Sequence, residues 1–164
     1  MLIYQSRNFK VEAPELPLVD RADGGHIVID PLIRVVDRQQ LTPLQAIELA
    51  RLTMVTGEAM TSVLIKHGVD IGRINYQDNG NWGVFKPEGP FMHVHLYGRA
   101  KSARVQLYGQ ACYFPHRDEN PKFYEKFNPL TAEDVLEIKK EIIALLKKKK
   151  YADTQWGLSN TDRP

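Results

Sequence analysis

The chain has 164 residues, of which 43% are hydrophobic and 26% are charged, and these values fit one compact domain with an ordinary core. A net charge of +2 is too small to indicate a nucleic-acid partner, and the single Cys112 excludes both an internal disulfide and a cysteine-rich zinc site. No apolar run reaches the roughly 18 residues of a membrane span, and the N-terminus lacks a signal-peptide pattern, so we expect a cytoplasmic protein with no membrane partner.

Short strands are predicted at the beginning of the chain. Residues 1 to 13 alternate unevenly between apolar and polar side chains, and the expected inward members are Leu2, Tyr4, Phe9 and Val11. After a turn-rich segment, His26–Pro31 predicts a β-branched strand that proline ends. His26 opens this strand, and on its own it is most simply a structural histidine that caps a turn.

Residues 42 to 67 predict one long helix whose two ends are both marked. Thr42 is a candidate N-cap, Pro43 suits the first helical position, and Gln45 lies where a capping box requires it. Gly68 follows the last turn as a C-terminal stop. The apolar residues form a broad side, which favours a helix that lies across a sheet.

A polar loop follows the next predicted strand, which spans residues 71 to 76. The loop is rich in amide side chains and glycine, and it includes Asn79, Asn81 and Lys86. Amides, backbone N–H groups and a lysine can bind an anion, but the same residue types also form ordinary long turns. From the residues alone both interpretations stay open.

The segment from residue 89 to 99 reads Gly-Pro-Phe-Met-His-Val-His-Leu-Tyr-Gly-Arg. Side chains of an extended chain alternate between two faces, so His93 and His95 are predicted to point the same way. Their apolar neighbours would then enter the core. The segment therefore predicts a strand that presents two imidazoles on one face.

The last third of the chain predicts further strands and a second helix. One kinked strand or two short strands are expected at residues 105 to 108 and 111 to 114. The helix begins after the N-cap Thr131, with Asp134 at the capping-box position and a lysine run at its end.

The His-x-His pair at residues 93 and 95 allows three interpretations. The two histidines could be structural, or they could bind zinc or iron with His26 or His116 as a third ligand. Alternatively, one imidazole could attack phosphorus or an acyl carbon while the other assists. Carboxylates are missing from the positions just after the pair, where a metal site would need them, whereas Arg99, Lys86 and the amide-rich loop suit an anionic substrate.

With these features in place, the sequence resembles the histidine triad (HIT) family. The order of the Gly-His strand, the long helix, the strand that carries Asn75 and the His-x-His segment carries the resemblance, which covers roughly residues 1 to 100. It implies an α+β fold, an antiparallel sheet with one long helix packed on it, and commonly a homodimer. We expect one domain at 1 to 150, in which a strand and helix extension at 101 to 150 follows the core. A loose tail is expected at 151 to 164, from which Trp156 could dock on the body.

The family motif has three histidines that alternate with apolar residues, followed by two apolar residues and a Gly-Arg ending. Aligned on that ending, His93 is the central, nucleophilic histidine, His95 is the third, and Phe91 replaces the first. Aligned from the left, His95 becomes the nucleophile and Tyr97 replaces the third histidine. We prefer the first alignment because the end of the motif then matches without a gap.

The resemblance implies a nucleotide hydrolase or nucleotidyl transferase, as in diadenosine tetraphosphate hydrolases, that acts at an α-phosphate through a covalent nucleotidyl-histidine without a cofactor or an obligatory metal. Besides the two catalytic histidines, it gives His26 and Arg99 supporting roles. The expected substrate contacts are Asn75, Asn79, Asn81 and Lys86, and apolar residues 16 to 19 could form a wall for a base. The alternatives are a non-catalytic nucleotide-binding protein on the same fold and a metal-dependent His-x-His enzyme.

Overall fold

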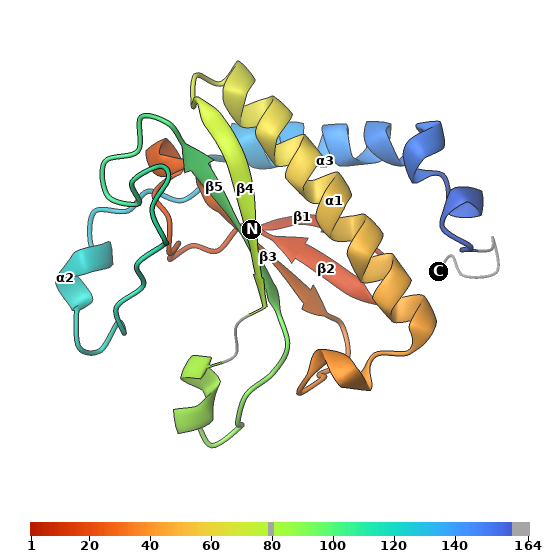
Figure 1. Ribbon diagram of the computed structural model, residues 1–164, viewed down its shortest axis with the longest axis horizontal. Coiled ribbons are helices and arrows are strands. Elements are labelled where there is room, and N and C mark those ends of the chain that lie inside the picture. Colours follow the sequence, from red (N-terminus) through yellow and green to blue (C-terminus); the bar gives the residue numbers. More distant parts are fainter. Residues whose placement is uncertain (79–80, 159–164) are drawn as a thin grey trace.

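The computed structural model describes residues 1–78 and 81–158. Its antiparallel sheet has the order β1-β2-β3-β5-β4, with β1 at Leu2–Gln5, β2 at Phe9–Glu12, β3 at His26–Pro31, β4 at Ile71–Asp78 and β5 at Val94–Ala100. The long α1 (Pro43–Lys66) crosses one face of the sheet, and α3 (Ala132–Leu146) packs against α1 (Figure 1). The short α2 (Pro121–Tyr124) stands apart from both helices. Short 3-10 helices occur at Arg21–Asp23, Arg38–Gln40, Asn81–Phe85, Lys149–Tyr151 and Asp153–Gln155. The fold class is α+β, as predicted.

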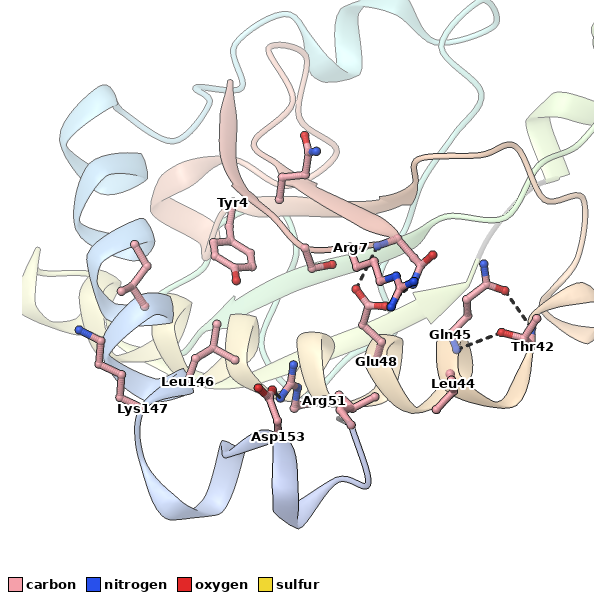
Figure 2. A pocket seen from close by; sticks show the side chains of 15 residues that line it. Tyr4, Arg7, Thr42, Leu44, Gln45, Glu48, Arg51, Leu146, Lys147 and Asp153 are labelled. Atoms are coloured by element: carbon pink, nitrogen blue, oxygen red, sulfur yellow. Dashed lines mark hydrogen bonds and ion pairs between the residues drawn. The ribbon is translucent and has the colours of Figure 1, made fainter. Parts of the chain in front are cut away.

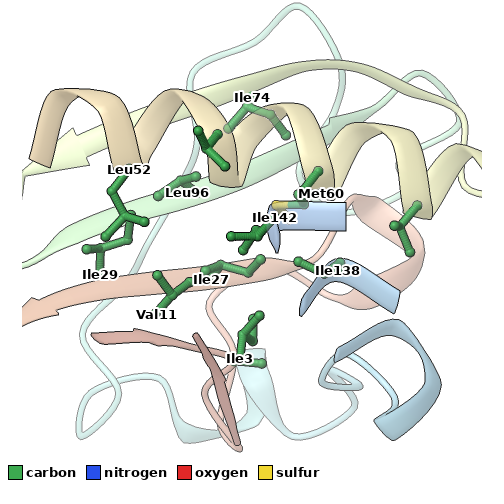
Figure 3. Close-up of a cluster of buried hydrophobic side chains, with 14 of the residues drawn as sticks. Ile3, Val11, Ile27, Ile29, Leu52, Met60, Ile74, Leu96, Ile138 and Ile142 are labelled. Atoms are coloured by element: carbon green, nitrogen blue, oxygen red, sulfur yellow. The ribbon is translucent and has the colours of Figure 1, made fainter. Parts of the chain in front are cut away.

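The core lies between the sheet and the two long helices (Figure 3). Alternate residues of the central strands point into it, and Ile27, Ile29 and Leu96 are fully buried. Each side chain of this size contributes about 1.5–3 kcal/mol by leaving water. The helices cover it with Leu52, Met60, Ile138 and Ile142. The apolar face of the sheet packs against the helices, so its polar face points away from them. Within the described ranges, none of the helices combines the length and the apolar character that crossing a bilayer requires.

Both long helices begin where the sequence predicts. The Thr42 hydroxyl accepts a hydrogen bond from the Gln45 N–H, and the Gln45 side-chain oxygen accepts one from the Thr42 N–H. Thr131 and Asp134 repeat this exchange at the start of α3. After α1, Gly68 has a φ of 84°, in the left-handed region that glycine adopts without strain.

The N-terminal strands form as predicted, but β1 turns a different residue inward. Ile3 is fully buried, whereas Leu2 is 54% exposed. The pairing of β1 with β2 shifts register between Leu2 and Tyr4, so simple alternation assigns the wrong face to Leu2. Tyr4 is partly buried against the core, as expected. Phe9 and Val11 are buried, as expected.

The strands predicted at residues 105 to 108 and 111 to 114 do not form, and this part of the extension is a loop. β5 already pairs with β3 and β4 on its two sides, so the chain that follows it cannot pair with β5. Side chains satisfy its backbone groups instead. The Gln106 amide exchanges two hydrogen bonds with the Tyr113 backbone. The Asp23 carboxylate accepts bonds of 2.8 Å from the N–H groups of Arg104, Val105 and Gln106.

Residues 151 to 158, which the sequence predicts to be a loose tail, pack on the body of the protein. Tyr151 is 1% exposed, and its hydroxyl donates to Glu58 at 2.7 Å. Arg51 of α1 forms an ion pair with Asp153, and Trp156 packs against the core. Docking of Trp156 was expected, whereas the polar composition of the segment gives no sign of the contacts of Tyr151 and Asp153. The rest of the predicted tail, 159 to 164, lies outside the described residues.

Candidate functional site

Three imidazoles meet on the face of the sheet that is turned away from α1. His26 is on β3, His95 is on the neighbouring β5, and His93 immediately precedes β5. The ring centroids of His93 and His95 are 4.5 Å apart, and those of His26 and His95 are 5.0 Å apart. The predicted alternation is confirmed, because Val94 and Leu96 belong to the core on the other face. Sheet pairing therefore brings His26 to the His-x-His pair.

The hydrogen bonds of His26 and His95 define which ring nitrogens carry protons. The Leu18 N–H donates to Nδ1 of His26 at 3.1 Å, so this nitrogen is an acceptor. In a neutral ring the proton is then on Nε2 of His26, which lies 2.8 Å from Nδ1 of His95 and donates to it. His95 must consequently carry its own proton on Nε2. This chain of hydrogen bonds, from the Leu18 N–H through His26 to His95, forms a relay that leaves Nε2–H of His95 as a free donor group at its end.

The surroundings keep both of these rings neutral. Burial lowers the pKa of His26 well below its ordinary 6.5, and the neighbouring His95 and Arg117 lower it further. Burial and the adjacent His93 lower the pKa of His95 to about 3. Neither ring is therefore protonated near neutral pH, and His95 is present as the Nε2–H tautomer.

We predict that this pair makes the protein less stable as the pH falls below about 6.5. In the unfolded chain a histidine takes up its proton near that pH, whereas folded His95 stays neutral down to about 3, so the unfolded state binds more protons in between. His95 alone should lower the free energy of unfolding by roughly 2 kcal/mol between pH 7.5 and pH 5. Urea unfolding at both pH values, in wild type and His95→Asn, measures the effect. The same pH dependence in both proteins would contradict it.

His93 has a different proton arrangement. Its Nδ1 lies 3.1 Å from the backbone carbonyl oxygen of Phe91, and because a carbonyl only accepts, Nδ1 carries the proton of the neutral ring. Nε2 then keeps a lone pair. The ring is partly exposed, and it stands at 83° to the His95 ring. The site therefore offers, side by side, a nitrogen that can attack and an N–H group that can donate.

Asp30 shares this face, and sequence reasoning missed it. Its carboxylate lies 3.9 Å from the Lys10 ammonium on β2. Burial raises the pKa of Asp30, and Lys10 and His93 partly oppose that shift. The sequence could have indicated this position, because Asp30 is four residues after His26 in the same strand and therefore lies on the same face. An acidic side chain thus belongs to the surroundings of His93.

β4 contributes two amide side chains next to the imidazoles. In the antiparallel register Asn75 stands opposite Tyr97, and Gln77 stands opposite His95. Asn75 makes a long contact of 3.8 Å with the Cys112 sulfur. The side-chain oxygen of Gln77 is buried, and it has no hydrogen-bond partner among the described residues. Sequence reasoning missed Gln77 because it ended the strand at residue 76.

The predicted anion-binding loop is described only in part. Lys86 is exposed in the turn after the 3-10 helix Asn81–Phe85, where its N–H bonds to the Gly83 carbonyl at 3.0 Å. Asn79 lies outside the described residues, and of Asn81 only the backbone is described. The substrate contacts expected of these three side chains therefore stay predictions.

The charge of Arg99 predicts a contact with a phosphate, but in the structure its side chain contacts the loop that follows β5. Its side chain is almost fully buried, and Nη1 lies 3.0 Å from the Cys112 sulfur. Nη2 donates to the carbonyl oxygens of Gln106, Leu107 and Gln110. Arg99 thus holds the loop that follows β5, and its support of the site is structural. Charge and motif position could not reveal these carbonyl partners, because they come from a loop that was predicted to be a strand.

His116 does not join the imidazole cluster. Its ring packs edge-on against Trp82, with centroids 5.0 Å apart. Over residues 1–78 and 81–158, no group of three or more His, Cys, Asp or Glu side chains is placed to hold a metal ion. Of the two candidate third ligands, His116 lies away from the pair, and His26 directs Nε2 into its hydrogen bond with His95.

A cavity of about 620 Å³ opens on the helical side of the sheet, between the β1–β2 turn, the start of α1 and the end of α3 (Figure 2). Charged groups in its walls bond to one another or to neighbouring amides: Glu48 accepts two hydrogen bonds from Asn8, and Arg51 pairs with Asp153. None of its lining residues belongs to the imidazole cluster. We therefore separate this cavity from the candidate site.

No protein-family model and no curated protein matches the sequence. Solved structures resemble the fold. A hypothetical histidine triad nucleotide-binding protein from Sulfolobus tokodaii is 13% identical, with a TM-score of 0.56 over 90% of this chain and 87% of that one. A zinc-bound histidine triad family protein from Mycobacterium smegmatis is 16% identical, with a TM-score of 0.53 over 88% and 84%. A uridylyltransferase is 18% identical, with a TM-score of 0.51 over 89% of this chain and 42% of its own. The likeness shows a histidine-triad-like fold, as the sequence resemblance implied.

Proposed function

We propose that the chain is a nucleotide hydrolase or nucleotidyl transferase that acts at an α-phosphate, with His93 as the nucleophile. The observation that carries the proposal is the hydrogen bond between Nδ1 of His93 and the Phe91 carbonyl, because it leaves a lone pair on Nε2 at a partly exposed position. The fold supports the same class, since its structural neighbours include a nucleotide-binding protein and a uridylyltransferase by name. His26 acts as a positioning residue that sets the tautomer of His95.

The reaction proceeds in two displacements. In the first, Nε2 of His93 forms a bond to the α-phosphorus, and the bond from phosphorus to the bridging oxygen breaks. The leaving group departs as an anion, and Nε2–H of His95 donates a hydrogen bond to the departing oxygen. In the second, the oxygen of water forms a bond to phosphorus, and the phosphorus–nitrogen bond breaks, which returns the electron pair to Nε2 of His93. One proton of the water passes to solvent, and the other stays on the phosphate of the released nucleoside monophosphate. In a transferase, an acceptor group replaces the water.

His95 acts as a hydrogen-bond donor rather than as a full proton donor. A ring whose pKa is about 3 is neutral, and a neutral imidazole releases its remaining proton with difficulty. His26 cannot resupply that proton, because its own Nδ1 already accepts from the Leu18 N–H. The site therefore suits leaving groups that are stable anions.

We predict that a nucleoside 5′-polyphosphate is turned over at least about tenfold faster, in kcat/KM, than the 5′-phosphoramidate of the same nucleoside. A polyphosphate leaves without added protons, whereas an amine has to be protonated as it departs. Steady-state rates with the two substrates at pH 7.5 check this. A preference for the phosphoramidate would contradict the role given to His95.

Retention of label tests the proposed intermediate. The protein is mixed with a nucleotide labelled at the α-phosphate, and the reaction is stopped with denaturant. The pH is kept alkaline because a phosphorus–nitrogen bond hydrolyses in acid. We expect up to one equivalent of label per chain, and an unchanged rate in the presence of a chelator. Turnover without retained label, or turnover that a chelator abolishes, would count against covalent catalysis by histidine.

A non-catalytic nucleotide-binding protein on the same fold is the second candidate, and the phenylalanine at position 91, in place of the first histidine of the motif, favours it. In that case nucleotide binds but no label is retained. The substrate contact expected of Asn75 applies to both candidates. The homodimer also stays a proposal. Light scattering tests it, because a homodimer has twice the chain mass of 18.8 kDa.

A further inference from the structure

A row of three titratable side chains crosses the polar face of the sheet and ends at His93. In the register of β2 with β3, Lys10 stands opposite Asp30. In the register of β3 with β5, Ile29 stands opposite Val94. One further step, to the residue just before β5, places Asp30 opposite His93. Asp30 is therefore a cross-strand neighbour of both, because opposite side chains of an antiparallel pair have Cβ atoms about 4.5–5.5 Å apart.

The neighbours of Asp30 keep its carboxyl group ionised. Burial raises its pKa from the ordinary 3.8. The Lys10 ammonium, 3.9 Å away on β2, opposes that rise, as does His93, whereas Glu12 adds to it. Lys10 also forms an ion pair with Glu12, so one cation lies between two carboxylates. Near neutral pH Asp30 therefore presents a negative charge beside His93.

The first displacement proposed above places a positive charge on the His93 ring. Nδ1 already carries a proton, which it donates to the Phe91 carbonyl. When the lone pair of Nε2 forms the bond to phosphorus, the bond to the bridging oxygen breaks, and its electron pair leaves with that oxygen. The ring then holds both a proton and a phosphoryl group, so it is an imidazolium cation. A fixed negative charge beside a group that becomes positive stabilises the transition state.

We propose that Asp30 promotes attack by His93, because its carboxylate stabilises the positive charge that develops on the ring. The proposal rests on the nucleotidyl chemistry proposed above. In this role Asp30 acts through His93 without touching the substrate, as a positioning residue. Its charge favours the adduct over the free ring, so it accelerates formation of the adduct but not the hydrolysis, in which the ring loses its charge. A residue that only maintained the fold would affect both steps alike.

Single-turnover kinetics of Asp30→Asn separate the two steps, because the substitution keeps the size of the side chain and removes its charge. At pH 8 we expect label to appear on His93 about tenfold more slowly than in wild type. The adduct, once formed, should hydrolyse at least as fast as in wild type. Glu12→Gln is the matched control, because it removes the same charge from the same face at a position opposite Val28. Both of its rates should stay within about twofold of wild type.

Equal rates of adduct formation in Asp30→Asn and wild type would overturn the proposal while leaving the nucleotidyl chemistry intact. A parallel fall in formation and hydrolysis would also overturn it, because that result indicates a general disturbance of the site. A tenfold fall in Glu12→Gln as well would show that charge at any place on this face has the same effect, which the proposal excludes.

If wild type forms no adduct, the proposed function fails, and acylation by diethyl pyrocarbonate still tests the effect of Asp30. With this uncharged reagent an imidazole nitrogen attacks a carbonyl carbon, ethyl carbonate leaves, and positive charge again develops on the ring. Peptide mapping follows His93, with His116 as the reference in the same sample. At pH 8 the rate at His93 relative to His116 should be about fivefold lower in Asp30→Asn than in Glu12→Gln. Equal relative rates in the two variants overturn the proposal.

Discussion

Replacing His93 with alanine should lower kcat at least about 1,000-fold and leave nucleotide affinity within a few-fold of wild type. The variant loses the nitrogen that forms the covalent bond, whereas the surrounding sheet face is retained. His93 is partly exposed, and within the described ranges its side chain forms a hydrogen bond only with the carbonyl of Phe91, two residues earlier, so we expect the free energy of unfolding to change little. Initial rates and equilibrium binding of a nucleotide check the two halves of this prediction.

His95→Ala is the companion variant. It removes a donor to the leaving group rather than the nucleophile, so it should be slower than wild type and still retain label on His93. Full activity in His93→Ala would refute the assignment of the nucleophile. If His95→Ala is inactive and His93→Ala is only slowed, the second alignment of the motif is correct, with Tyr97 in place of the third histidine.

Asp134→Ala should lower the free energy of unfolding by about 3–5 kcal/mol. Asp134 is fully buried, and it accepts from two atoms of Arg21, at 2.6 and 2.9 Å, and from Nδ1 of His67 at 2.7 Å. Burial would raise the pKa of this carboxyl, but the hydrogen bonds from Arg21, His67 and Thr131 outweigh it and hold the pKa far below its usual value. The alanine variant leaves Arg21 without its partner.

Glu133→Ala is the matched control, because Glu133 is exposed in the same helical turn, and we expect it to change stability by less than about 0.5 kcal/mol. Urea unfolding at pH 7 measures both variants. A cost below about 1 kcal/mol for Asp134→Ala would contradict the role of this network. Because the lowered pKa keeps Asp134 charged until strongly acidic pH, the difference between the two variants should persist down to about pH 4.

The segment that contains Arg21 contacts three parts of the chain: α3, β5 and the loop after β5. Asp23, two residues later, holds the loop after β5 through three backbone N–H groups. Gly24 lies against Gly98, where an added Cβ would stand 2.0 Å from the Gly24 carbonyl oxygen. The glycine of the Gly-Arg ending is therefore required by this close approach. The network thus positions β5 and the extension together.

Features that depend on neighbouring residues could be predicted from the sequence. The capping boxes at Thr42 and Thr131 mark both long helices, because side-chain oxygens there satisfy N–H groups that a helix leaves open. Period-two alternation separates His93 and His95 from the core-facing Val94. The strand pairing agrees with the fold that the resemblance to histidine triad proteins implied.

Features that depend on distant partners could not be predicted. The bonds from Asp23 to the loop span about 80 residues, and no local pattern shows that a carboxylate, rather than a strand, will satisfy residues 104 to 106. The same loop takes the donors of Arg99, whose charge alone suggested a phosphate contact. The proton positions on the imidazoles also depend on Leu18, which the sequence marks only as an apolar residue.

Mapping the trapped adduct tests the central claim most directly. The protein is incubated with substrate, stopped under alkaline denaturing conditions and digested, and tandem mass spectrometry locates the nucleotidyl group. We predict a single modified position, His93, with the modification absent from His93→Ala and present in His95→Ala. A nucleotidyl group on His95, or turnover with no modified histidine, would contradict the account.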